Sequence, residues 1–84
     1  MIHVGKMIKA VFDEQPKAHT VTWFADQLHC KRTNIYNIFR RQAIDTALLA
    51  RISLILDHDF FHDLSEALKA YRDRPNPETT GVMG

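Results

Sequence analysis

Cysteine, glycine and proline are all scarce in this chain of 84 residues, which has one cysteine, three glycines and three prolines. A single cysteine cannot form an internal disulfide, so a secreted, disulfide-stabilised scaffold is excluded. No apolar run reaches the roughly 18–20 residues that a membrane-spanning helix requires, and residues 1–6 lack the apolar stretch of a signal peptide. We therefore expect one small soluble domain in the cytoplasm, with no membrane partner.

The sequence also lacks the patterns that carry most enzyme chemistry. It has no glycine-rich phosphate loop and no nucleophile and base at a recognisable spacing. His58 and His62 lie four residues apart among aspartates, a spacing that could place two imidazoles on one face of a helix. Two histidines lack a third fixed ligand, so solvated histidines behind a helix-capping Asp59 are the favoured interpretation. The sequence predicts no catalytic residue, no metal site and no cofactor.

Apolar residues recur at helical spacing along five segments, and no segment alternates with the two-residue period of a strand. The expected helices cover about residues 3–14, 23–28 after a cap at Thr20 or Thr22, 32–40, 46–56 after a cap at Asp45, and a fifth from Phe60. The predicted fold class is therefore all-α, a compact five-helix domain over residues 1–72. Residues 73–84, with two prolines and two glycines, are predicted to form a flexible tail.

Positive charge is concentrated in one part of the chain. Residues 1–44 carry seven Lys/Arg against three Asp/Glu, a net charge of +4, whereas residues 45–84 carry four against seven, a net charge of −3. The cluster that stands out, interrupted by no acid, is Lys31, Arg32, Arg40 and Arg41. Such a cluster is typical of a surface that binds a polyanion, although an ordinary solvated face is the alternative.

The same segment has the pattern of two short helices joined by a tight turn. Ala25 supplies the small side chain that two closely crossing helices need. The apolar positions that would face the shared core are Phe24, Leu28, Cys30, Ile35 and Ile38. This pattern assigns Cys30 a structural role, and it predicts a helix-turn-helix whose second helix can enter the major groove of DNA.

Residues 21–40 resemble the helix-turn-helix of the phage-repressor and Cro-like family of bacterial regulators, the XRE family, and the resemblance extends from about His3 to Glu66. It implies a repressor-like fold and a sequence-specific, DNA-binding regulator of transcription. Three positions depart from the family pattern. His29 replaces a common glycine, so the turn is left-handed there or differs in shape. Val21 replaces a common glutamine, and Lys31 replaces a capping hydroxyl.

The resemblance implies a role for each exposed residue of the second helix. Arg32, Thr33 and Asn37 match the positions that contact base edges, where Arg can pair with guanine and Asn with adenine. The residues assigned to phosphates are Thr22, Lys31, Asn34, Tyr36, Arg40 and Arg41. The implied partner is double-stranded DNA.

The fifth helix carries more apolar residues than a compact domain of this kind needs. They are Phe61, Leu64, Leu68 and Tyr71, and they suggest a homodimer interface that would match a two-fold operator. The alternative function is a protein-interaction module, an adaptor or antitoxin-like partner with weak or partner-dependent DNA binding. Such a module would dock this stripe on another protein together with Trp23. We expect Trp23 on the outward side of its helix, either packed against the first helix or part of an interface.

Overall fold

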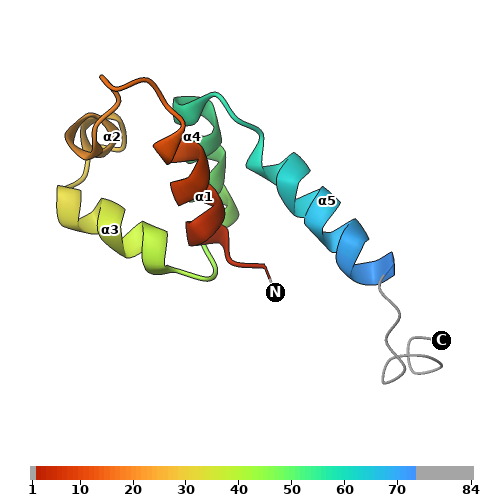
Figure 1. Cartoon of the computed structure of the whole chain (residues 1–84). Helices are drawn as coiled ribbons and strands as arrows, with labels where there is room; N and C mark the ends of the chain where they lie inside the picture. The colour runs from red at the N-terminus through yellow and green to blue at the C-terminus, as the bar shows by residue number, and fades with distance from the viewer. Residues whose placement is uncertain (1, 74–84) are drawn as a thin grey trace.

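The computed structural model describes residues 2–73, and over that range it consists of five helices without a strand (Figure 1). The helices are α1 (Val4–Asp13), α2 (Val21–Gln27), α3 (Arg32–Arg40), α4 (Thr46–Leu56) and α5 (Phe60–Asp73). The predicted all-α class is confirmed. Asp73, where the tail is predicted to begin, is the last residue of α5, and the rest of that tail lies outside the described residues. None of these five helices is long and apolar enough to cross a membrane.

Side chains that accept hydrogen bonds from the first turn set where the helices begin. Thr20, Asp45 and Asp59 cap α2, α4 and α5 through bonds of 2.8–3.1 Å to backbone N–H groups. The ring of His3 does the same for α1 at 3.1 Å. Each bond satisfies a donor that has no partner inside the helix. Of the two caps expected for α2, Thr20 is the one used, and the side chain of Thr22 is left exposed.

The start of α1 is packed directly against the end of α3. The backbone N–H groups of Val4 and Gly5 donate to the carbonyls of Gln42 and Arg41, at 3.0 and 2.8 Å. A Cβ at Gly5 would lie 2.5–2.6 Å from the carbonyl oxygens of Ile38, Phe39 and Arg41. Only a residue without a side chain permits this approach. The contact pairs the free donors of one helix with free acceptors at the end of another and fixes the direction of α3.

One apolar core lies among α1–α4 and the first turn of α5. Its largest fully buried side chains are Ile8, Phe24, Ile35, Leu49, Ile52, Leu56 and Phe60. Phe12 stacks on Phe24 with ring centroids 5.4 Å apart and lies 5.5 Å from the ring of Phe39. Burial of each such side chain contributes about 1.5–3 kcal/mol. Because Ile35 and Phe39 belong to this core, α3 is held along its whole length.

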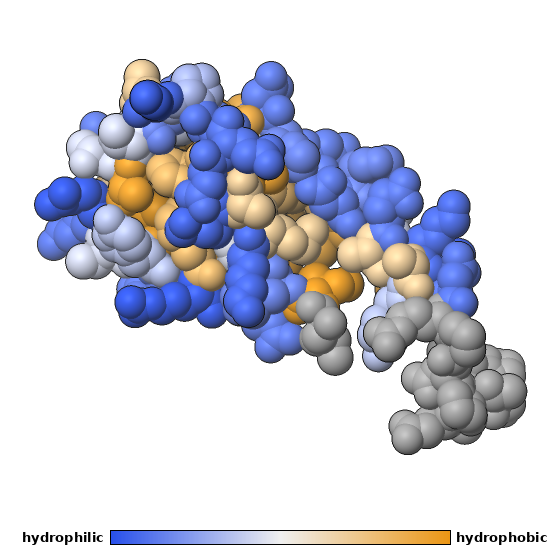
Figure 2. Space-filling view, viewed as in Figure 1, coloured by the Kyte–Doolittle hydropathy of each residue, from blue (hydrophilic) through white to orange (hydrophobic). Residues whose placement is uncertain are grey.

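Helix α5 follows a different course from the other four and runs away from them (Figure 1). It packs against α4. Phe60 is its only buried residue, and Leu64 is partly buried at the edge of the core. Figure 2 shows apolar side chains gathered in the region where α5 leaves the bundle, between more polar surfaces. Most of α5 is therefore a surface helix.

Candidate nucleic-acid interface

The turn between α2 and α3 ends one helix and aims the next. The N–H of His29 donates to the carbonyl of Asp26 at 3.1 Å, and the N–H of Cys30 donates to that of Ala25 at 2.9 Å. With His29 at a φ of 56°, this is the Schellman arrangement that closes many helices. Of the two alternatives for His29, the left-handed conformation is the one adopted, so the turn keeps a tight shape without glycine.

The packing face between α2 and α3 agrees with the pattern read from the sequence. Phe24, Ala25 and Leu28 of the first helix and its turn are buried, as are Ile35 and Ile38 of α3. Ala25 is only 2% exposed, so a larger side chain there would force the two helices apart. The predicted helix-turn-helix geometry, two short helices crossing over a small residue, is present.

The opposite face of α3 carries only polar, basic and aromatic side chains, and all of them are exposed. They are Arg32, Thr33, Asn34, Tyr36, Asn37 and Arg40. Thr33, Asn37 and Arg40 occupy neighbouring turns on the most outward side of the helix, since positions three and four apart share a face. Arg32 lies at the N-terminal end of the same surface. The helix therefore offers a row of hydrogen-bonding groups with its other side anchored in the core.

Within residues 2–73, the side chains of this face have no hydrogen-bond or ion-pair partner in the protein. The same holds for Lys31, Arg41 and Thr22, the remaining residues predicted to contact phosphates. Lys31 stands at the N-cap of α3 without a side-chain cap bond, as its chemistry predicts. Among residues 2–73 the N–H groups of Arg32 and Thr33 are open as well, whereas that of Asn34 donates to the carbonyl of Lys31 at 2.9 Å. Positive charge and free donors thus coincide on one surface.

A hollow of about 360 Å³ lies between α3 and α4, directly beside this surface. Asn34, Asn37 and Arg41 line it from the α3 side, and Arg51 lines it from α4. The guanidinium of Arg51 donates to the carbonyl of Leu28 at 3.3 Å, so it braces the turn before α3 from outside. Sequence reasoning missed Arg51. The only signal was a basic residue flanking the apolar stripe of the fourth helix.

Cys30 is half-buried beside the same hollow and packs against the core. Burial raises the pKa of its thiol, and the nearby Arg51 guanidinium opposes that rise. The thiol therefore stays protonated near neutral pH and behaves as a small apolar group. The structural role assigned to Cys30 fits this environment.

The two histidines considered as metal ligands do not share a helix face. His58 precedes α5 and donates through Nε2 to the carboxylate of Asp63, whereas His62 lies inside α5 with its ring 3.7 Å from Glu66. The spacing argument for one helix face is therefore wrong, because α5 begins only at Phe60. No group of three His, Cys, Asp or Glu residues in the described part of the chain is arranged to hold a metal ion.

Trp23 is partly buried. Its ring stacks on that of His19 at a centroid distance of 3.7 Å and an interplanar angle of 4°. His19 in turn donates to Gln15, whose side-chain amide donates to the carbonyl of Leu56. Of the two alternatives for Trp23, the structure favours packing within the chain, because the loop after α1 covers its ring. The ring thereby connects that loop to the end of α4.

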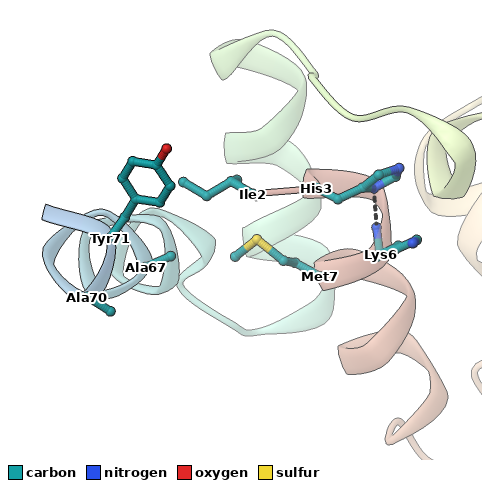
Figure 3. A pocket seen from close by; sticks show the side chains of 7 residues that line it. All are labelled: Ile2, His3, Lys6, Met7, Ala67, Ala70 and Tyr71. Carbon is teal, nitrogen blue, oxygen red and sulfur yellow. Dashed lines mark hydrogen bonds between the residues drawn. The ribbon is translucent and has the colours of Figure 1, made fainter. Parts of the chain in front are cut away.

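The four residues of the predicted dimer stripe divide into three environments. Phe61 and Leu68 are exposed, whereas Leu64 packs at the edge of the core. Tyr71 faces a groove of about 580 Å³ between α5 and the start of α1. Figure 3 shows Ile2 and Met7 pointing into this groove toward α5, with His3 and Lys6 pointing away. Tyr71 is nevertheless exposed, so Leu64 is the one member of the stripe that packs against the core of its own chain.

Comparisons of the chain with family models, with curated proteins and with solved structures returned no match in any of the three. Its function is therefore inferred from its own residues and their arrangement.

Proposed function

We propose that this chain is a sequence-specific DNA-binding regulator of transcription that reads the major groove with α3. The observation that carries the proposal is the outer face of α3, where polar and basic side chains stand exposed and unpartnered among residues 2–73 while the inner face is buried. The major groove of B-DNA admits an α-helix. The XRE-like pattern of residues 21–40 supports the same function.

The proposed contacts to bases follow from the chemistry of three side chains. Arg32 can donate two hydrogen bonds to guanine, Asn37 can bond adenine in the same bidentate way, and the methyl group of Thr33 can pack on thymine. Thr33 and Asn37 lie one turn apart, and Arg32 lies at the start of the helix. Together they would read successive base pairs along the groove.

The proposed contacts to phosphates lie at both ends of α3. Lys31 stands at its start, where the N–H groups of Arg32 and Thr33 have no partner among residues 2–73, and Arg40 and Arg41 stand at its end. Anions bind favourably at helix N-termini, and basic side chains hold the backbone without reading sequence. Affinity should therefore fall steeply as salt rises, because each phosphate contact releases counterions.

We also propose that the protein works as a homodimer, because a two-fold operator presents two equal half-sites. A protein-interaction module remains the second candidate function. It is favoured by the large apolar side chains left exposed on α4 and α5, Leu54 and Leu68 above all. A pure docking module would show no sequence preference on DNA and little dependence of binding on salt.

The test is selection from a pool of random duplexes at near-physiological salt, with sequencing of the bound fraction. The variants are Arg32→Ala and Asn37→Ala, and the control is Lys69→Ala, which removes one exposed positive charge from α5 instead. We expect a two-fold motif with half-sites about one helical turn apart. Each α3 variant should lose roughly 5- to 150-fold in affinity, corresponding to about 1–3 kcal/mol.

The control separates base reading from general charge. Lys69→Ala should keep both the motif and the affinity, because its side chain lies far along α5 from α3. Unchanged affinity and preference in both Arg32→Ala and Asn37→Ala would show that α3 is not the recognition helix. Absence of any enriched motif, with a tightly co-purifying protein, would favour the interaction module.

A further inference from the structure

Three large apolar side chains form an exposed ridge along α4 and α5. Leu54 is 82% exposed, Leu68 59% and Phe61 39%. Leu54 and Phe61 line one shallow hollow of about 440 Å³ where α4 turns into α5. Leu68 lies two turns beyond Phe61 on the same side of α5. Large apolar side chains exposed together on one side of the molecule mark an interaction site more often than scattered single residues do.

The groove in Figure 3 is lined on α5 by Ala67, Ala70 and Tyr71, and helical spacing places Phe61 and Leu68 to one side of these residues. The groove is closed on its far side by Ile2 and Met7 of the same chain, so it is a loose contact between α1 and α5. The ridge has no such covering within residues 2–73, because Leu54, Phe61 and Leu68 are all exposed. It is therefore the ridge that offers a surface to a partner.

Exposed charges along this ridge change sign from one end to the other. Asp57 and Asp59 line the hollow beside Phe61, whereas Arg72 lies one turn beyond Leu68 on the same side of α5. Two such helices placed antiparallel bring each acidic start beside a basic end. A parallel arrangement brings like charges together, and it also aligns the two helix dipoles unfavourably.

We propose that the ridge binds a second copy of this chain, with the two α5 helices antiparallel about a two-fold axis beside Ser65. About that axis Phe61 packs on the partner's Leu68, and Arg72 meets the partner's Asp57. The small side chain of Ser65 lets the helices approach where they cross. The pairing rests on the proposed function for its purpose, since it supplies the dimer that a two-fold operator requires.

The first test measures association of the full chain by sedimentation equilibrium without DNA. Leu68→Glu should weaken the dimer on the order of 100-fold, because the two-fold axis buries the new charge twice. Ala10→Glu adds the same charge at an exposed site on α1, and Ala70→Glu adds it on the groove side of α5. Both should leave association unchanged, and circular dichroism checks that each variant is folded.

Two results would overturn the proposal. One is a wild-type chain that stays monomeric at its highest soluble concentration, which would leave the ridge to residues 74–84 or to another protein. The other is a dimer that survives Leu68→Glu but is lost in Ala70→Glu. Neither result would contradict the proposed binding of DNA by α3. That proposal is tested separately by measuring binding of the Leu68→Glu chain to a single half-site.

The second test fixes the direction of the pair by oxidation of single-cysteine variants in a Cys30→Ala chain. Ser65→Cys should form a disulfide-linked dimer, because the two copies of this position meet at the axis. Leu68→Cys should not, since antiparallel helices would separate its two copies by about 10 Å along their length, beyond disulfide reach. Efficient crosslinking at Leu68→Cys, as a parallel pair requires, would overturn the antiparallel arrangement.

Discussion

The α1–α3 contact and helix α5 are held in place to very different degrees. At Gly5, backbone meets backbone, with two inter-helix hydrogen bonds of 2.8 and 3.0 Å from the start of α1. Helix α5 spans 14 residues and buries only Phe60 completely. The α1–α3 contact holds the end of α3 in a single position. The packing of α5 leaves most of that helix dependent on what lies outside the monomer.

This difference suits the two roles that we propose. A helix that reads bases gains affinity when its side chains need little ordering on binding, and α3 is fixed at both ends before DNA arrives. A helix with few buried contacts opens locally at small free-energy cost. Association through α5 would therefore stabilise α5 itself, whereas DNA binding would find α3 already in place.

The largest effect that the comparison predicts is between two leucines. Leu49→Ala in α4 should destabilise the protein by about 2–5 kcal/mol, because Leu49 is 2% exposed and its loss leaves a cavity. Leu68→Ala in α5 should change the free energy of unfolding by less than about 0.5 kcal/mol in the monomer. Urea unfolding at a concentration that keeps the chain monomeric measures both. Equal losses would mean that α5 is as firmly packed as the rest.

A smaller effect is expected for Gly5→Ala, and its sign shows whether the α1–α3 contact outweighs helix propensity. Helix propensity alone says that Gly5→Ala stabilises α1 by about 0.5–1 kcal/mol. The added Cβ would instead meet three carbonyl oxygens at 2.5–2.6 Å, so we expect destabilisation of about 2–3 kcal/mol. Thermal or urea unfolding decides between the two signs. Ala10→Gly, at an exposed position of the same helix, is the control and should cost about 1 kcal/mol from propensity alone.

The sequence predicted the helices well because each depends on local chemistry. Thr20, Asp45 and Asp59 cap helices one to three residues away, and apolar spacing identifies the buried side of α3. The role of Gly5 could not be predicted, because it depends on where the chain returns after α3. No sequence pattern around a glycine near the start of a helix indicates that another segment of backbone packs against it.

In the candidate site, too, the sequence predicted the features that depend on one helix and missed those that depend on contacts between helices. The exposed set on α3 follows from the same helical spacing that buries Ile35 and Ile38. Arg51 was missed because its partner, the carbonyl of Leu28, lies 23 residues away along the chain. Tyr71 was grouped with Leu68 because spacing alone cannot tell which flank of a surface helix faces a neighbouring element. Contacts between elements, unlike contacts within one, leave little trace in periodicity.

The smallest effect concerns the two turns that hold residues with positive φ, His29 before α3 and Asp57 before α5. His29→Gly should stabilise the protein by about 0.5–1 kcal/mol, because relief of left-handed strain outweighs the added freedom of the unfolded chain. His29→Ala retains a Cβ and should bring no gain. The side chain of His29 is exposed, so neither change removes buried packing.

Asp57→Gly makes the same exchange where α4 turns into α5. The stabilisation from relieved strain is present only while α5 stays packed against α4. We therefore expect it to slow hydrogen exchange of α5 amides while shifting the unfolding midpoint less than His29→Gly does. Amide exchange followed by NMR, beside urea unfolding, measures both quantities at a concentration that keeps the chain monomeric, because Asp57 is also the proposed partner of Arg72 in the dimer. If both glycine variants raised the midpoint equally, α5 would unfold together with α3, and the contrast between a firmly held α3 and a loosely held α5 would be lost.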